Sequence, residues 1–324
     1  MAQEMPKEPR GSRSDHWIVL TLLIMVAIPA SITLRAVRAP GKMQILDANP
    51  TPHGYTWSLL LFAFPIAAVA IWFLRLVRIE VPRRAFWRTL AVLVPFGFGL
   101  DFFFAHLFFL FPNAGATIGL NAPALGKPVP VEEYIFYLSG FLAILLIYIW
   151  LDEFWLLAYN VRDYPHAAKQ IRRLLQFHPT SAIAGFVLIA AAILYKKMLS
   201  PVPDGFPGYF TFLVCVGLVP AAGFFPTVKP FINWRAFGLT LFFVLLVSLL
   251  WEVTLAIPYG WWGYQPTQML GVFVGAWSNL PLEAVCVWVA VTYGTAILFE
   301  AFKLWQASGK PVRHAFLGIE KTSL

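Results

Sequence analysis

Long runs of apolar residues decide what this chain can fold into. A helix needs about 20 consecutive, predominantly apolar residues to cross the hydrocarbon core of a bilayer. Runs near this length lie at 17–37, 55–77, 86–111, 133–152, 181–200, 208–227, 237–257 and 280–302. Because 59% of the residues are hydrophobic and only 12% are charged, we predict an all-α polytopic membrane protein with about eight transmembrane helices.

The distribution of Lys and Arg predicts how these spans are oriented. If the N-terminus is cytoplasmic, the segments on the cytoplasmic side hold 18 of the 24 basic residues, as the positive-inside rule expects. An even number of spans then places both termini in the cytoplasm. We therefore expect a multi-pass protein of the cell membrane, whose net charge of +8 reflects topology and not a nucleic-acid surface.

The two halves of the chain resemble each other at a fixed offset of 151 residues. Residues 84–90 fall on 235–241, Asp101 falls on Glu252, and 130–133 fall on 281–284. This pattern predicts two tandem four-helix repeats of the same orientation. The expected organisation is a cytoplasmic tail at 1–16, a first repeat at 17–152, a cytoplasmic linker at 153–180, a second repeat at 181–302 and a cytoplasmic tail at 303–324. We interpret the charged segment from Asp152 to Arg173 as a solvated amphipathic connector.

Carboxyl groups inside the spans, or at their starts, are the candidate functional residues. A carboxylate at the centre of a span costs about 2.5–3.5 kcal/mol on insertion scales and usually faces the interior of the bundle. Two such residues lie in the third helices of the repeats and three lie at the starts of the fourth helices: Asp101 and Glu252, then Glu132, Glu133 and Glu283. A purely structural role is the alternative. Asp101 and Glu252 could hold helices together, and the Pro-x-Glu motifs that contain the other three acids could simply mark the start of a helix. All five are expected at the outer helix ends, where they could converge on one pocket and supply a Brønsted acid.

Aromatic residues make up 17% of the chain, and many of them flank these acids. Aromatic belts at the membrane interfaces explain part of this content. Rings beside an acid also suit a reaction through a carbocation, since they attract the cation and exclude the water that would trap it. The candidates for lining a substrate or stabilising a cation are Phe102, Tyr134, Trp262 and Tyr264.

Taken together, these residues resemble the integral-membrane lycopene cyclases that occur as heterodimers in actinobacteria and as fused chains in archaea and fungi. The resemblance covers most of 55–302 and rests on Trp87-Arg88, Asp101 and the run 130–137 (Pro-Val-Glu-Glu-Tyr-Ile-Phe-Tyr) in the first copy, and on Trp251-Glu252, Trp262-Gly263-Tyr264, Met269-Leu270-Gly271 and Leu280-Pro281-Leu282-Glu283 in the second. It maps the acids of the family's Pro-x-Glu-Glu pattern to Glu132, Glu133 and Glu283. The sequence departs from the pattern at Ala284, where a second acid is expected, and at Asp101, which lacks the flanking Trp and Asn.

The resemblance implies a cyclisation of lycopene or a related carotene without net redox change and without a cofactor. Glu133 or Glu132 would protonate the terminal double bond of an acyclic end group. Asp101, Glu252 or Glu283 would then remove a proton from the new ring. The implied partners are the hydrophobic carotenoid, the lipid bilayer, and a second copy of the chain or other enzymes of the carotenoid pathway.

Two other function classes stay open at the level of the sequence. A carotenoid end-group hydratase would use the same cation but capture it with water. A non-catalytic carrier or lipid-binding protein would also show a repeated bundle with intramembrane acids. Other chemistries lack their marks, because the six His form no His-x-x-x-His pair, no Asp-x-x-Asp motif occurs, and residues 97–102 lack the third glycine of a dinucleotide-binding loop.

Overall fold

The computed structural model describes residues 52–75, 81–161, 164–275 and 277–319, together with Leu20 and Ile24. Within these ranges, seven helices are long and apolar enough to cross a membrane. They lie at the positions of the second to eighth expected spans. The expected first span at 17–37 and the tail at 1–16 fall outside the described residues, apart from Leu20 and Ile24.

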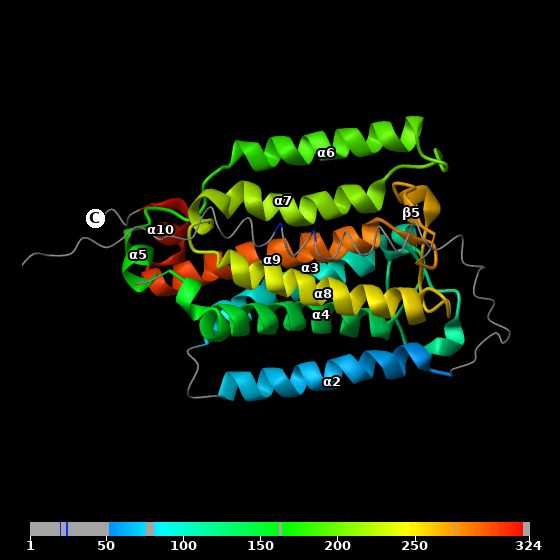
Figure 1. The fold of residues 1–324 in the computed structure, drawn as a ribbon, viewed down its shortest axis with the longest axis horizontal. Helices are drawn as coiled ribbons and strands as arrows, with labels where there is room; N and C mark the ends of the chain where they lie inside the picture. The colour runs from blue at the N-terminus through cyan, green and yellow to red at the C-terminus, as the bar shows by residue number, and fades with distance from the viewer. Residues whose placement is uncertain are drawn as a thin grey trace, which may run out of the picture.

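The long helices lie side by side along the longest axis of the molecule (Figure 1). In chain order they are α2 (Gly54–Arg75), α3 (Arg83–Phe108), α4 (Val131–Trp150), α6 (Pro179–Met198), α7 (Gly208–Val228), α8 (Trp234–Trp251) and α9 (Glu283–Ser308). Two short helices, α5 (Tyr164–Gln170) and α10 (Val312–Leu317), lie at one end of the bundle, which we call the linker end. The opposite end, formed by the loops 109–130 and 257–282, is the cap end.

The outer faces of the helices carry apolar side chains that no other described element covers. Leu61 and Phe186 are 76% and 75% exposed, and Phe64 and Val219 are also exposed. A patch of this kind would be a liability in water, but it is the surface that lipid tails solvate. The proline inside α2, Pro65, fits the same setting, because prolines are tolerated in transmembrane helices.

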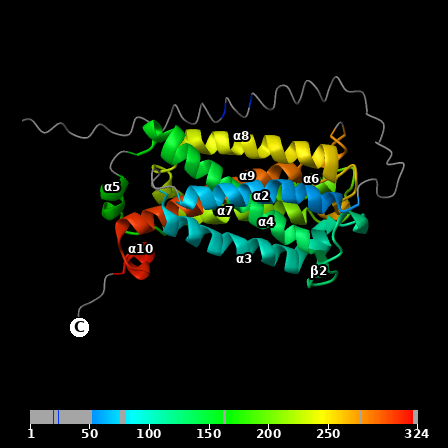
Figure 2. The ribbon, with the colours of Figure 1, turned by 90° about the horizontal axis from the view of Figure 1, so that it is seen from below.

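Two helices occupy the centre of the bundle and the others pack around them. Helix α9 packs against α3, α4, α7 and α8, while α4 also packs against α2, α3 and α8. Helix α2 lies on one flank, against α4, and α6 lies on the other, against α7 (Figures 1 and 2). The fold therefore brings α4 and α9 together in the interior although they are far apart in sequence.

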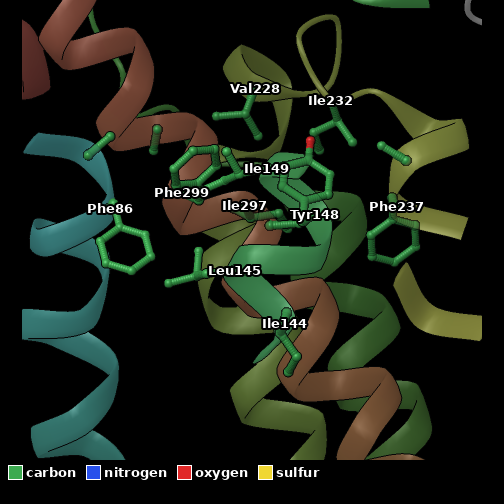
Figure 3. Packing of buried hydrophobic residues seen from close by; sticks show 14 of the residues in the cluster. Phe86, Ile144, Leu145, Tyr148, Ile149, Val228, Ile232, Phe237, Ile297 and Phe299 are labelled. Atoms are coloured by element: carbon green, nitrogen blue, oxygen red, sulfur yellow. The ribbon is translucent and has the colours of Figure 1, made fainter. Parts of the chain in front are cut away.

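The main core fills the linker-end half of the bundle. Phe86 of α3, Leu145 and Ile149 of α4, and Ile297 and Phe299 of α9 are fully or almost fully buried in one cluster, which Figure 3 shows. Between membrane helices there is no large hydrophobic gain from leaving lipid, so close van der Waals packing of such side chains is what holds the helices together.

The cap end contains three antiparallel two-stranded ladders. β1 (Phe109–Leu110) pairs with β4 (Gly263–Tyr264), β2 (Asn121–Ala122) pairs with β3 (Val129–Pro130), and β5 (Phe273–Val274) pairs with β6 (Leu280–Pro281). The first ladder joins the loop after α3 to the loop after α8. The expectation of a helical protein is confirmed. These short strands are the only β-structure in the described residues.

Two helices end in π-helical turns that carry acids. Helix α4 continues as a π turn at Leu151–Trp155, and α8 continues as one at Glu252–Ala256. The bonds from Leu156 N to Leu151 O (2.7 Å) and from Ile257 N to Glu252 O (3.0 Å) close these wider turns. Such turns are rare and occur frequently at functional sites.

A buried charged group, the linker-end ion cluster, joins α4, α5 and α9. Lys303 Nζ lies 2.8 Å from Asp152 Oδ2 and 2.5 Å from Glu153 Oε1. The hydroxyls of Tyr148 and Tyr164 each donate to Glu300 at 3.0 Å. Burial and the nearby Glu300 raise the pKa of Tyr164 well above its usual value, so its hydroxyl stays a donor.

Most described residues of the segment from Asp152 to Arg173 are exposed or half-buried, as expected for a solvated amphipathic connector, but its first acid is not. Asp152 and Ala168 are both 0% exposed, and Leu174, directly after the segment, is also buried. Lys303 accounts for the difference, because a cation on α9 makes it favourable to hold acids of the connector inside the protein.

Candidate active site

All five predicted carboxyl residues lie at the cap end and are buried. Asp101 lies in the last third of α3, Glu132 and Glu133 in the first turn of α4, Glu252 at the end of α8, and Glu283 at the start of α9. Their exposed fractions are 0% for Asp101 and Glu283, 1% for Glu132, 3% for Glu252 and 7% for Glu133. Antiparallel neighbours produce this gathering, since α3 and α8 end where α4 and α9 begin.

Three of these residues form one group, the acid cluster: Asp101, Glu133 and Glu252. Glu133 lies within electrostatic range of both Asp101 and Glu252. The Tyr55 hydroxyl, from the first turn of α2, donates to Glu133 Oε1 at 2.6 Å. Neither carboxyl oxygen of Asp101 has a hydrogen-bond partner among the described residues. The cluster is thus a set of acids held by a phenol and by packing, without a cation in an ion pair in the described part of the chain.

The Glu252 carboxyl has one hydrogen bond among the described residues, and it is long. The Tyr264 hydroxyl, from β4, lies 3.4 Å from Glu252 Oε1, and Glu252 Oε2 has no partner among the described residues. Burial and the Glu252 carboxyl raise the pKa of Tyr264 well above its usual value. Tyr264 therefore remains a neutral donor beside this acid.

The other two acids hold loop backbone instead. Glu132 Oε1 accepts from the Ile118 N–H at 2.9 Å and from Thr56 Oγ1 at 2.5 Å. Glu283 Oε1 accepts from the Leu270 N–H at 2.5 Å. Each glutamate thereby fixes the loop that precedes its own helix. All five acids therefore gather at the cap end, but Glu132 and Glu283 are engaged with the loops, and their predicted convergence on one pocket stays a prediction.

An aromatic wall of five residues, Tyr55, Phe136, Trp251, Trp261 and Trp262, lies beside the acid cluster. The ring centroids of Trp251 and Trp262 are 4.8 Å apart, and those of Tyr55 and Trp262 are 5.1 Å apart. Phe136 stacks on Trp251 at 5.8 Å. Offset and edge contacts at these separations stabilise the packing beyond the buried area alone. Trp262, a predicted substrate-lining residue, contacts Tyr55, whose hydroxyl holds Glu133; its role stays a prediction.

The remaining predicted aromatic residues have different surroundings. Tyr264 packs against Phe109 at 5.9 Å and Tyr209 at 6.2 Å between ring centroids. Phe102 and Tyr134 instead line an open hollow of about 380 Å³, together with Phe98, Gly99, Phe103, Ala122 and Pro123. Phe102 is 38% exposed, so these two residues lie at an open surface, and their predicted role in lining a substrate stays a prediction.

Five residues that build the site were not predicted from the sequence as site residues: Tyr55, Thr56, Phe136, Trp251 and Trp261. Trp251 had a signal, because it directly precedes an acid in an apolar run, and Phe136 lies one turn after Glu133. Tyr55 and Thr56 had none. They meet their glutamates only because α2 packs against α4, across 78 and 76 residues of sequence.

In the described part of the chain, no group of three or more His, Cys, Asp or Glu residues is arranged to hold a metal ion. Cys215 and Cys286 are both free. Comparison with known proteins adds no assignment, because no family model, no curated protein and no solved structure matches the chain.

Proposed function

We propose that the chain is an integral-membrane carotenoid cyclase that closes an acyclic end group of lycopene or a related carotene. The observation that carries the proposal is the acid cluster, in which Asp101, Glu133 and Glu252 are buried at one end of a membrane bundle. Buried carboxyls are costly in this setting and mark functional sites. Their partners here are the phenols Tyr55 and Tyr264, which leaves them suited to proton transfer.

Glu133 is the proton donor of this proposal, because it is the least buried of the five acidic residues and Tyr55 holds its carboxyl. Its proton would form a C–H bond with the π electrons of the terminal double bond, which leaves a tertiary cation. The next double bond along the chain would attack this cation and form the ring C–C bond. Asp101 or Glu252 would take a proton from the ring, and the electrons of that C–H bond would form the ring double bond. The product is an isomer of the substrate.

The surroundings of the acids suit this reaction better than hydration. The rings of the aromatic wall, Trp262 among them, present π faces that attract a developing cation. The same rings pack closely enough to exclude the water that would convert the cation into an alcohol. Tyr55 would orient Glu133 through their 2.6 Å hydrogen bond.

We further propose that the architecture is a tandem repeat. The first residues of α3 and α8, Arg83 and Trp234, are 151 residues apart. The strands β3 and β6, which immediately precede the acid-bearing helices, have the same separation. Pairs of elements related by one offset are the mark of a duplicated unit.

The proposed orientation places the linker end and both termini in the cytoplasm of a cell membrane. Helices α2, α3 and α8 carry Arg75, Arg83 and Arg235 at their linker ends, as the positive-inside rule expects. Two of the cap-end lysines are bound to carbonyl groups, since Lys196 donates to Pro266 O at 3.0 Å and Lys197 donates to Gly205 O at 2.8 Å.

Expression of the chain in cells that accumulate lycopene, followed by chromatography and mass analysis of the pigment, tests the proposal. A product of unchanged mass and shifted absorption is expected. A product heavier by one water would favour the hydratase. Unaltered lycopene, with the protein present in the membrane, would contradict the cyclase and favour a carrier.

Two variants sharpen this test. Glu133→Gln removes the proposed proton donor, and we expect it to reduce ring formation by about 10²–10⁴-fold, the usual contribution of a general acid. Asp204→Asn is its control, because Asp204 is an exposed loop acid. Equal product from both variants, at equal protein levels in the membrane, would remove Glu133 from the mechanism.

A further inference from the structure

An apolar groove of about 250 Å³ runs along α4 between α2 and α8. Helix α4 forms its floor, because α4 packs against both α2 and α8. The lining has no charged side chain, and its only hydroxyls are Ser139 and Ser248. The Ser139 hydroxyl already donates to the Phe136 carbonyl at 2.9 Å. The groove therefore offers little to the head group of a lipid and much to a hydrocarbon chain.

One end of the groove meets the aromatic wall. Phe136 and Trp251 line the groove and also belong to the wall. Glu133 lies one helical turn before Phe136, and Glu252 directly follows Trp251. With a rise of about 1.5 Å per residue, the lining of α4 from Phe136 to Ile147 extends for about 16 Å away from the acids. A linear chain in the groove would thus point one end at the acid cluster.

The long side of the groove is open. Phe243 and Val247 of α8 line it and are 39% and 47% exposed. Both lie within a helix that is apolar enough to cross a membrane, so the opening faces the hydrocarbon core of the bilayer. A molecule that reaches the groove from this side comes from the membrane and not from water.

We propose that this groove is a lateral binding site for the linear isoprenoid chain of the substrate, which slides in from the bilayer with one end group toward Phe136 and Trp251. The inference rests on the proposed function for the identity of the chain. Binding itself requires no turnover, so it can be measured separately.

The test uses the full chain in phosphatidylcholine nanodiscs and a farnesyl-type hydrocarbon that carries a diazirine at one end. After irradiation, peptide mass spectrometry locates the label. Val247→Trp fills the groove, and Leu246→Trp is the matched control, because Leu246 is 46% exposed on the same helix and does not line the groove. We expect label on α2, α4 and α8 that excess lycopene displaces. We expect about tenfold less label in Val247→Trp only, because a side chain that overfills the groove should weaken binding by about tenfold.

The outcomes separate this inference from the cyclase proposal. Label spread over all lipid-facing helices, or equal label in the two variants, would overturn the groove. Displacement by palmitate as efficient as by lycopene would overturn its isoprenoid occupant. Groove labelling without any cyclised pigment in lycopene-producing cells would leave the groove standing and remove the cyclase. If Val247→Trp and Leu246→Trp formed equal amounts of cyclised pigment, the cyclase proposal would stand and the groove would be overturned as its substrate site.

Discussion

Replacing Lys303 by methionine removes the cation of the linker-end ion cluster and keeps an unbranched side chain of similar length. The Lys303 side chain is 9% exposed, and the Asp152 and Glu153 side chains are 0% and 15% exposed. Removal of one partner from a buried ion pair typically costs about 3–5 kcal/mol. Glu300 keeps its two tyrosine donors, whereas Asp152 Oδ1 has no partner among the described residues. We therefore expect Lys303→Met to leave Asp152 and Glu153 without a cation and to lower the unfolding free energy by about 3–5 kcal/mol.

Unfolding of the purified protein in detergent, followed by tryptophan fluorescence, measures this loss. Lys229→Met is the control, because Lys229 is exposed at the end of α7 and such surface changes usually stay within about 0.5 kcal/mol. A triple variant, Lys303→Met with Asp152→Asn and Glu153→Gln, removes the unpaired acids as well. We expect it to regain most of the stability, because a buried ion pair contributes little relative to neutral residues of the same shape.

Two results would refute this reasoning. If Lys303→Met unfolded like Lys229→Met, the cluster would not be a buried ion pair. If the triple variant were as unstable as Lys303→Met, the loss would come from packing and not from charge. Both variants also lose the cation–π contact of Lys303, whose Nζ lies 4.7 Å from the centre of the Tyr164 ring.

Three further outcomes follow from the cap end. Gly271→Ala places a side chain at φ 95° and should lower the unfolding free energy by about 1–2 kcal/mol. Gly99→Ala lies in a helix with free space around the new Cβ and should raise the unfolding free energy by about 0.5–1 kcal/mol. Thermal unfolding in detergent compares the two variants. Tyr55→Phe leaves Glu133 without its donor and should cost about 1–3 kcal/mol, measured in the same way; an unchanged midpoint would show that the bond is dispensable. The raised pKa of Tyr264 predicts no tyrosinate absorbance from this residue at its ordinary midpoint near pH 10, in a titration against Tyr264→Phe. Because the unfolded chain loses the Tyr264 proton first, the contribution of Tyr264 to the unfolding free energy should be constant below about pH 10 and should fall as the pH rises above this value.

The positions of the helices could be predicted from the sequence because bilayer thickness fixes the length of an apolar run. The expected span at 208–227 is helix α7, Gly208–Val228. The prediction failed where a charge was satisfied inside the protein. The last span was expected to end at 302, before Lys303, but α9 continues to Ser308 and holds Lys303 in ion pairs with Asp152 and Glu153.

The acids of the site could also be predicted, since a carboxyl in an apolar run is conspicuous. Their separate surroundings could not. Glu132 and Glu133 are neighbours in sequence, but successive residues of a helix point about 100° apart, and only packing decides which side faces Tyr55 and which faces Thr56. That packing is set by α2, which carries no charge near its start and gives no signal of its own.

Within the proposed repeat, the two halves differ at the hydrogen bond of the proposed proton donor. At the offset of 151 residues, Glu133 falls on Ala284 and Tyr55 falls on Phe206, so both partners of the hydrogen bond are absent from the second half. Ala284 is 0% exposed, and a carboxyl there would lack this donor. Glu132 and Glu283 occupy matching positions and both hold loop backbone. The glutamate that holds loop backbone is thus present in both halves, whereas the proposed proton donor is present in one. A chain of this kind has one acid cluster, assembled from both halves, and as a cyclase it would close one end group at a time.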